Sequence, residues 1–410
     1  MFQSRYSRMA LSLTLLAVLA SGCSVLVPTP EPVTISFAHP EDPTGSYEHW
    51  VQEFQEQNPH ITVELVSRDS VSASELPRKD VFAVSQFELA NYVGEQAVLD
   101  LTGFIEQDEE LDIGDFYPAA LDVFRSAGRQ WALPFSIDIM MVYYNRDLFD
   151  RYSVAYPELG WDWGDFVGTA MDVTDPGADL FGYALQHESD MAIFEPVIFI
   201  YQHGGGIVDD LKAPTRATLD DPLNIEALEF YAALMYDYGV SPTAEDALHM
   251  GRPYPWRSVM EQKVAMWSSL YSERGGLRWP AQWNFEWGIV PMPRDQMAGT
   301  LALTDGLFIS AESEHPDVAW QWVRFLSRKM APFQVPARRS LAESAEYEQE
   351  VGRDVAVSAR ATIADAILIY PEVLGFEATI NAMLEAFTQI RTGEVTPDIA
   401  LSTAQEKTGY

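Results

Sequence analysis

Apolar and polar positions repeat along the chain with two different periods, and these periods follow one another in turn. Residues 33–37 alternate apolar and polar as a strand does, residues 47–54 place apolar side chains three and four positions apart as a helix does, and residues 61–65 alternate again. The helix is expected to stop before Pro59, because proline disfavours helical backbone in the residue that precedes it. Strand, helix and strand in this order predict a parallel sheet covered by helices, which is the α/β class.

The longest strand pattern lies at residues 131–149, which read WALPFSIDIMMVYYNRDLF. Pro134 fixes φ and withholds a donor, as in an extended segment. Residues 139–144 form an apolar run that suits one buried strand and is too short for a membrane-spanning helix. Residues 145–147 are polar and open a helix. We therefore expect a buried strand that crosses from one part of the molecule to another.

Length and charge narrow the class of protein. A chain of 410 residues exceeds what one hydrophobic core usually serves, so two lobes are expected. Acidic residues outnumber basic ones by 61 to 26, giving a formal net charge of −35. Such a surface repels nucleic acid and anionic lipid headgroups, so neither is expected as a partner.

The N-terminus carries a targeting pattern. Two arginines precede an apolar stretch at 9–20, and small residues lead to Cys23, the only cysteine of the chain. This pattern resembles a bacterial lipoprotein signal, although Ala20 stands where such signals prefer leucine. The resemblance implies that residues 1–23 are a signal peptide with a lipobox and that Cys23 is acylated. Residues 24–32 would form a proline-rich tether; the alternative is an uncleaved membrane anchor.

Several short motifs resemble one protein family. Residues 54–65 read FQEQNPHITVEL, residues 287–293 read WGIVPMP, and the 131–149 segment contains LP, YYN and LF in order. Together they resemble the extracellular solute-binding proteins of ABC importers, family 1, which are similar to maltose- and maltodextrin-binding proteins. The resemblance implies a type II periplasmic-binding-protein-like fold, with two α/β lobes, a three-segment hinge and a ligand cleft between the lobes.

The resemblance also implies lobe boundaries. Lobe 1 would comprise residues 33–138 and 304–336, and lobe 2 residues 139–303 and 337–410. One departure from the family concerns residues 67–79, into which a full crossover helix between two parallel strands barely fits. The cleft wall is therefore expected to be open there.

A triple glycine follows in the predicted second lobe. Residues 204–206 lack the Gly-Lys-Ser/Thr ending of a phosphate-binding loop, so they are expected to form a tight turn.

Candidate ligand-binding residues come from strand ends and crossings, because ligands of α/β sheets meet the carboxyl ends of strands. A sugar site needs aromatic platforms and ionic or amide side chains that form charge-assisted hydrogen bonds. The candidates are His39, Glu41 and Asp42 after the first strand, Ser85 and Gln86 after the third, Tyr201, Trp267, Ser268 and Tyr271 in lobe 2, and Asp138, Asp305 and Arg338 at crossings.

The resemblance ranks these candidates and leaves alternatives. Asp138 stands where maltodextrin-binding members carry a cleft carboxylate, and Trp267 is the expected stacking platform. Ser85 and Gln86 could instead cap a helix, Trp267 could be a core residue, and Arg338 could be a structural cation of the hinge.

No signature of catalysis appears, because the chain has no HExxH or GxSxG motif and its 7 histidines show no metal-ligand spacing. We expect no cofactor and no metal. The resemblance implies a monomeric, extracytoplasmic lipoprotein, attached to the membrane only by its lipid. It would capture a sugar or oligosaccharide by closing its lobes and pass it to an ABC transporter permease. The alternatives are an extracellular glycan hydrolase, or the same fold with a polyamine, metal or glycerol phosphate as cargo.

The lipoprotein assignment predicts the mature N-terminus. Mass spectrometry of the protein expressed in a bacterial host is expected to find a chain that begins at Cys23 and carries acyl groups. An unmodified Cys23 within an uncleaved chain would refute lipidation.

Overall fold

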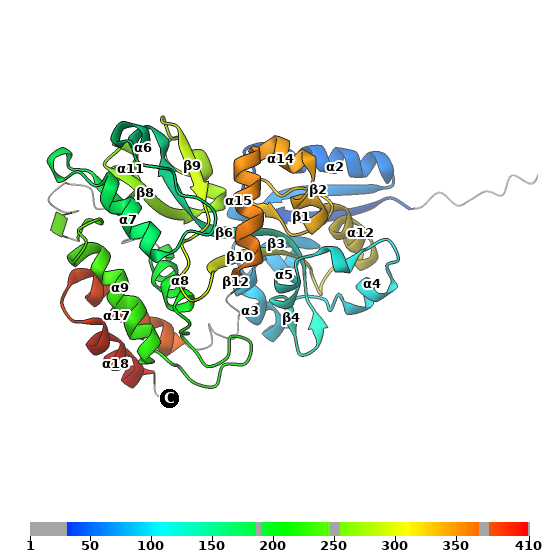
Figure 1. Ribbon diagram of the computed structural model, residues 1–410. Helices are drawn as coiled ribbons and strands as arrows, with labels where there is room; N and C mark the ends of the chain where they lie inside the picture. The colour runs from blue at the N-terminus through cyan, green and yellow to red at the C-terminus, as the bar shows by residue number, and fades with distance from the viewer. Residues whose placement is uncertain (1–30, 186–189, 244, 247–254, 369–376, 409–410) are drawn as a thin grey trace, which may run out of the picture.

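One sheet of ten strands runs through both halves of the molecule in the computed structural model, which describes residues 31–185, 190–243, 245–246, 255–368 and 377–408 (Figure 1). Its main path has the order β2-β1-β3-β10-β6-β8-β7, and β9, β11 and β12 pair beside that path. The ten strands are β1 (Val33–His39), β2 (Ile61–Ser67), β3 (Val81–Ser85), β6 (Leu133–Asn145), β7 (Phe181–Ala184), β8 (Val264–Leu270), β9 (Trp287–Val290), β10 (Thr300–Ile309), β11 (Val335–Pro336) and β12 (Ala366–Leu368).

Helices cover the two halves separately (Figure 1). The half that holds β1–β3 carries α2 (Ser46–Gln57), α3 (Leu89–Gly94), α4 (Thr102–Gln107), α5 (Pro118–Asp122), α12 (Pro316–Leu326) and the small hairpin of β4 (Arg125–Ser126) and β5 (Arg129–Gln130). The other half carries α6 (Arg146–Tyr152), α7 (Trp163–Val173), α8 (Phe194–Gln202), α9 (Pro222–Tyr236), α11 (Pro255–Met260), α17 (Glu377–Thr392) and α18 (Pro397–Lys407). Between them lie α13 (Arg339–Ala342), α14 (Ala345–Val351) and α15 (Arg353–Ala364).

The predicted strand–helix–strand beginning is confirmed. β1 and β2 pair in parallel, and β3 pairs with β1 in parallel on its other side. The connection between β2 and β3, into which a full helix was expected barely to fit, contains only two 3₁₀ turns, η1 (Arg68–Ser70) and η2 (Leu76–Arg78). The triple glycine forms the predicted turn, since the amides of Gly204 and Gly205 donate back to the last turn of α8.

β6 is the strand that joins the halves, and it extends beyond the predicted apolar run. All of its residues are buried. Its first part pairs antiparallel with β10, from Leu133 to Ile139, and its second part pairs with β8, from Met140 to Tyr144. One continuous backbone therefore belongs to the sheets of both halves.

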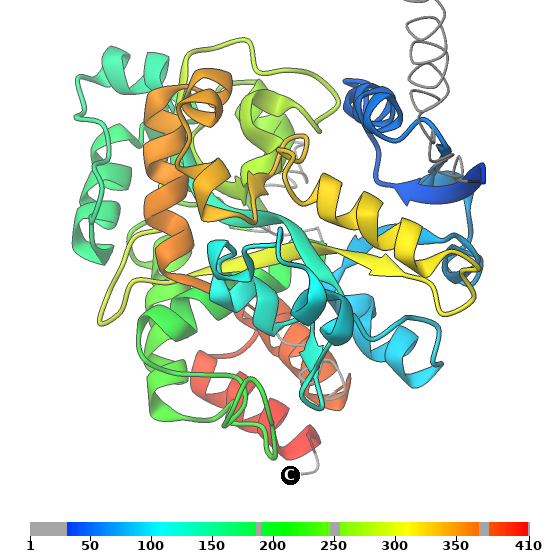
Figure 2. The same cartoon turned by 90° about the vertical axis from the view of Figure 1, so that its right-hand side faces the viewer.

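Two further segments pass through the same region. β10 pairs with β3 near its C-terminal end and with β12 near its N-terminal end, and β11 pairs with the middle of β6. Figure 2 shows β10, in yellow, running through the centre of the molecule. Three segments thus connect the halves, while the lobe boundaries given above stay a prediction.

The two faces of β6 contribute to two different hydrophobic cores. Met141 and Tyr143 belong to the core that contains the side chains of β1, β3 and α12. Met140, Val142 and Tyr144 belong to the core under α7, α8 and α9. Successive side chains of a strand point to opposite faces, so a run that is apolar at every position suits a strand with a core on each side.

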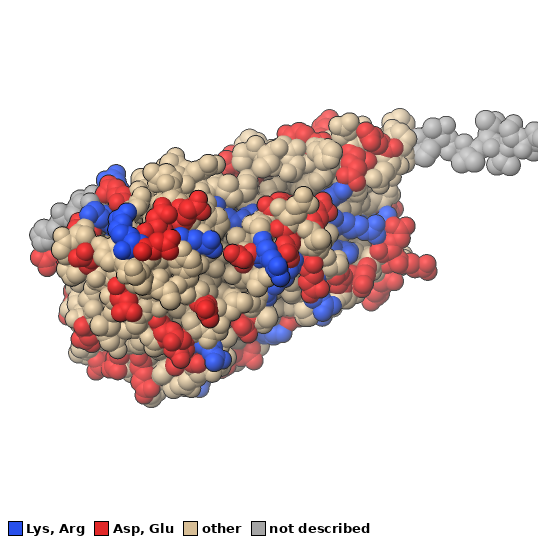
Figure 3. Space-filling view, turned by 45° about the horizontal axis from the view of Figure 1, so that its top comes forward, with Lys and Arg blue, Asp and Glu red and all other residues tan. Residues whose placement is uncertain are grey.

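The surface is acidic, as the composition requires. Acidic side chains cover both halves of the face shown in Figure 3, with lysine and arginine side chains interspersed. Within the described ranges, no helix combines the length and apolar character needed to cross a membrane. The predicted signal peptide, the predicted lipidation site Cys23 and nearly all of the predicted tether lie outside the described residues.

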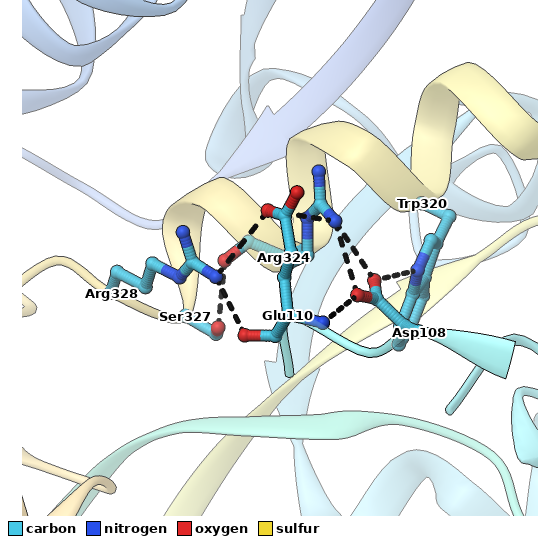
Figure 4. Close-up of polar contacts among 6 residues, drawn as sticks. All are labelled: Asp108, Glu110, Trp320, Arg324, Ser327 and Arg328. Carbon is cyan, nitrogen blue, oxygen red and sulfur yellow. Dashed lines mark hydrogen bonds and ion pairs between the residues drawn. The ribbon is translucent and has the colours of Figure 1, made fainter. Parts of the chain in front are cut away.

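A polar cluster fastens the loop after α4 to α12 (Figure 4). Asp108 accepts hydrogen bonds from Trp320 Nε1 at 2.8 Å and from Arg324 at 3.1 Å, and Arg328 donates to the carbonyl of Glu110 at 2.8 Å. These contacts tie residues more than two hundred positions apart, which stabilises the discontinuous half that contains them.

A buried carboxyl group organises the other core. Glu195 on α8 is fully buried and accepts hydrogen bonds from Tyr183 at 2.5 Å, Ser268 at 2.7 Å and Tyr231 at 3.4 Å. A carboxyl group removed from water is tolerated when such donors replace its hydration.

This cluster yields a stability prediction. Tyr183→Phe removes a hydrogen bond to the buried carboxyl group and is expected to lower the free energy of unfolding by about 1.5–3 kcal/mol, measured by urea denaturation. The control is Tyr156→Phe, which removes a hydrogen bond to Asp150 at an exposed position and should cost less than about 1 kcal/mol. Equal losses in the two variants would contradict the structural role given to Glu195.

Candidate ligand-binding site

A cavity of about 370 Å³ lies between the two halves, where the crossing segments meet. Its walls come from the loops after β1 and β2, from β10, from the segment after β8 and from the segment before β11. The lining side chains that bear on ligand chemistry are Glu41, Arg68, Arg278, Trp279, Asp305 and Phe333. The cavity is thus built from the strand ends where the sequence rules place ligands.

Two carboxyl groups sit on the crossing strands at the base of this region. In the β6–β10 ladder Asp138 faces Leu303, and Asp305 faces Ser136. Directly opposed residues share a face of the sheet, so both carboxyl groups lie on one face at diagonal positions, with Cβ atoms about 7–8 Å apart. The two strands therefore hold the acids in a fixed relation.

Burial changes the acidity of both groups. Asp138 is only 2% exposed and accepts a hydrogen bond from the Ser272 amide at 2.9 Å. Loss of hydration disfavours the charged form and raises the pKa of Asp138 to about 6. Burial likewise raises the pKa of Asp305, whose carboxyl group lines the cavity.

Two arginines line the cavity together with Asp305. Arg68 donates to the carbonyl of Ala83 at 3.2 Å, and Arg278 is exposed. Among the described residues, neither guanidinium group has a carboxylate within ion-pair distance. In a chain with so many acidic side chains, both cations remain available to a ligand.

An aromatic surface completes the wall. The half-buried Trp279 donates from Nε1 to Glu273 at 3.0 Å, which fixes the plane of its ring. A ring face, guanidinium donors and carboxyl acceptors in one cavity can hold a ligand that has an apolar face and several hydroxyl groups at its edge.

The predicted residues of the first half take different positions. Glu41 lines the cavity and is exposed. The ring of His39 packs 4.8 Å from that of Tyr47. Asp42 accepts hydrogen bonds from the amides of Thr44 and Tyr47 and so fixes the start of α2.

Ser85 and Gln86 lie at the end of β3. Ser85 caps the 3₁₀ turn η3 (Gln86–Glu88) by accepting from the Phe87 amide. Gln86 is fully buried and accepts from the Thr304 amide of β10. Both side chains accept hydrogen bonds from backbone amides in the described structure, which favours the capping alternative.

The predicted aromatic platform is inside a core. Trp267 is 1% exposed, and its ring packs against those of Tyr143, Trp283 and Phe285. Its place on β8 gives it the same face as Tyr143, its partner on β6. Trp279, at the end of the same aromatic cluster, has the position in the cavity that was expected of Trp267.

The other lobe 2 candidates and the hinge cation also lie outside the lining of this cavity. Ser268 belongs to the Glu195 cluster, Tyr271 shares a 2.7 Å hydrogen bond with Tyr347, and Tyr201 is half-buried on α8. Arg338 forms an ion pair with Asp115 at 3.1 Å and stacks on Phe116, and its burial lowers its pKa. These contacts favour the structural-cation alternative for Arg338.

Of the six lining side chains that bear on ligand chemistry, four were not among the sequence candidates. Arg68 directly follows β2, so the rule that singled out Glu41 would also have found Arg68. Arg278, Trp279 and Phe333 lie in irregular segments whose path the sequence pattern does not fix. Within the described ranges, no group of three or more His, Cys, Asp or Glu side chains could hold a metal ion.

Two α/β lobes joined by three crossing segments, with a cavity between them, define a type II periplasmic-binding-protein-like fold. The chain belongs to the family described as bacterial extracellular solute-binding protein, whose family model matches residues 39–331. The resemblance found in the sequence, to family 1 of the solute-binding proteins, is thereby confirmed.

Relatives and solved structures agree with this assignment. A binding protein of Brucella abortus (strain 2308) is 22% identical over 382 residues, covering 89% of each chain. A lipoprotein of Streptomyces antibioticus is 24% identical and covers 89% of this chain and 85% of its own length. An ABC substrate-binding protein of Listeria monocytogenes in complex with cycloalternan has a TM-score of 0.73 at 21% identity, with 92% of this chain and 98% of that chain covered.

Another solved structure extends the range of ligands. UgpB from Mycobacterium tuberculosis, in complex with glycerophosphocholine, has a TM-score of 0.74 at 15% identity, with 93% of this chain and 98% of that chain covered. At these identities the structural likeness establishes the fold.

The raised pKa of Asp138 predicts how stability depends on pH. The folded state keeps the Asp138 proton up to about pH 6, whereas the unfolded chain releases it near pH 4. Ionisation of Asp138 therefore lowers the free energy of unfolding as pH rises through this window, by an amount on the order of 3 kcal/mol. Below pH 4 the group is protonated in both states, so its full contribution to stability is present and no longer changes with pH.

Asp138→Asn removes the titrating group. The difference in unfolding free energy between this variant and the unmodified protein, from urea titrations at pH 4, 5, 6 and 7, should shift in favour of the variant by about 3 kcal/mol as pH rises. Asp172→Asn, which changes an exposed carboxylate on α7, is the control and should run parallel to the unmodified protein. Parallel curves for Asp138→Asn would refute the buried, protonated carboxyl group.

Proposed function

We propose that the interlobe cavity captures a sugar or oligosaccharide by closure of the two lobes, and that the protein delivers it to an ABC transporter permease. The protein would be a monomer, held at the outer side of the cell membrane by a lipid on Cys23. The observation that carries the proposal is the grouping of Asp305, Arg68, Arg278 and Trp279 in one cavity between the lobes.

This grouping suits a neutral polyhydroxyl ligand. Asp305 accepts hydrogen bonds from hydroxyl groups, the two arginines donate to hydroxyl or ring oxygens, and the indole face of Trp279 covers apolar C–H groups. Ligand capture requires no chemical reaction. It requires only that the closed state binds the ligand more tightly than the open state does. The cycloalternan complex of the Listeria protein supports a carbohydrate as cargo.

A phosphate-containing ligand is the second candidate. Arg68 and Arg278, which form no ion pair with a described carboxylate, could also hold an anion, and UgpB has glycerophosphocholine in its complex. Asp305 opposes this candidate, because an ionised carboxyl group in the same cavity repels phosphate.

The hydrolase alternative has less support from the geometry. A glycosidase needs two carboxyl groups that flank the scissile bond. Asp138 is buried, bonded to the Ser272 amide, and does not line the cavity. Glu41 lines the cavity with Asp305, but Glu41 is exposed and no hydrogen bond among the described residues fixes its carboxyl group. Chromatography of the sugar after incubation tests this alternative, since a binding protein returns the ligand unchanged.

Ligand titration tests the proposal. Tryptophan fluorescence and thermal shift with mono- and oligosaccharides should detect saturable binding, because a ligand of the native state raises the melting temperature. Asp305→Asn is expected to weaken binding by about 10- to 100-fold, through loss of a charge-assisted hydrogen bond worth about 1.5–3 kcal/mol.

Asp147→Asn, at an exposed position on α6, provides the control and should keep full affinity. Saturable binding of glycerophosphocholine together with no response to any sugar would replace the first candidate with the second. Wild-type affinity for sugar in Asp305→Asn would contradict the assignment of this cavity.

A further inference from the structure

A second, larger cavity adjoins the first between α2 and α14. Its volume is about 960 Å³, and Leu277, Pro332 and Phe333 belong to the walls of both cavities. We call the 370 Å³ cavity the inner cavity and the 960 Å³ cavity the outer cavity. Because they share these three residues, the two cavities lie next to each other between the lobes.

The outer cavity combines aromatic rings with charges of both signs. Trp50, Trp283 and Trp287 contribute rings to its wall. Lys329 and Glu53, also in the wall, form an ion pair at 2.6 Å and so largely neutralise each other. This wall suits a polar, uncharged ligand with flat apolar faces.

Phe333 marks the boundary between the cavities and has an unusual backbone. Its φ of +66° lies in the left-handed region, which costs a bulky residue on the order of 1–3 kcal/mol and persists where surrounding contacts impose it. One such contact is visible, since Arg274 donates a hydrogen bond to the Phe333 carbonyl and stacks 4.3 Å above the Tyr271 ring. The chain thus holds the half-buried Phe333 at the junction at an energetic cost.

The two volumes differ in what they can accept. A volume of 370 Å³ is near the lower end of the range for small-molecule sites, and 960 Å³ is near the upper end. A single sugar ring would leave the outer cavity to water. A chain of sugar units would bury ring faces against Trp279 in the inner cavity and against the tryptophans of the outer cavity.

We propose that the ligand is a linear oligosaccharide whose terminal unit occupies the inner cavity, whose chain passes Phe333, and whose further units occupy the outer cavity. This inference rests on the proposed function of the inner cavity and adds the chain length and the second compartment. Phe333 is the positioning residue at the junction, and Trp287 is the half-buried platform of the outer cavity.

The first measurement compares chain lengths. Malto-, cello-, xylo- and chito-oligosaccharides of one to five units are screened by thermal shift, and each series that responds is titrated by calorimetry. Affinity is expected to rise about tenfold or more between the disaccharide and the tetrasaccharide. Equal affinity for all lengths would overturn the outer compartment while leaving the proposed function in place. No response to any sugar would overturn both.

Two variants then separate the compartments. Trp287→Ala removes the platform, and Glu350→Trp fills the outer cavity from an exposed position on α14 without removing a core side chain. Both should lower affinity for the tetrasaccharide about tenfold or more and leave affinity for the shortest bound sugar unchanged. The second variant decides the question if Trp287→Ala fails to fold.

Trp279→Ala and Tyr238→Ala are the matched aromatic controls. Trp279→Ala, in the inner cavity, should weaken binding of every length, and Tyr238→Ala, exposed near the end of α9, should weaken none. The inference is refuted if Glu350→Trp binds the tetrasaccharide as the unmodified protein does, or if it weakens all lengths equally.

Discussion

The structure depends on one long buried strand whose backbone hydrogen bonds are divided between two lobes. The first part of β6 pairs with β10 and β11, and its second part pairs with β8 and β9. Because the strand is buried along its whole length, its backbone N–H and C=O groups must find partners within the protein. Burial of the Asp138 carboxyl group on this strand likewise costs folding free energy. A polar side chain at such a position therefore indicates a functional role or a defined structural contact.

Burial also explains how a strongly acidic protein can have a binding cavity that contains both acidic and basic side chains. The chain carries a net charge of −35, yet the wall of the inner cavity contains two arginines beside Asp305, and burial raises the pKa of that acid. The cavity therefore has a chemistry that the overall charge does not predict. Recognition in this fold follows from the few side chains on crossing strands and strand ends, while the many exposed carboxylates govern solubility.

The sequence predicted the fold well, because its evidence lay in periodicity and in family motifs. The alternation of strand and helix, the buried crossing strand and the short link after β2 all follow from local patterns and chain lengths. Site residues were harder to predict because β8 is buried on both faces, so its pattern does not say which face reaches the cleft. Trp267 therefore could not be distinguished from Trp279, which lies in an irregular segment where no period applies.

The central claim is that two lobes joined by three crossing segments close around a ligand held between them. Small-angle X-ray scattering, with and without a saturating sugar whose binding calorimetry has established, tests this claim most directly. The account predicts a smaller radius of gyration in the bound state, because the outer parts of the lobes approach each other. Identical scattering profiles for the free and the fully bound protein would contradict it.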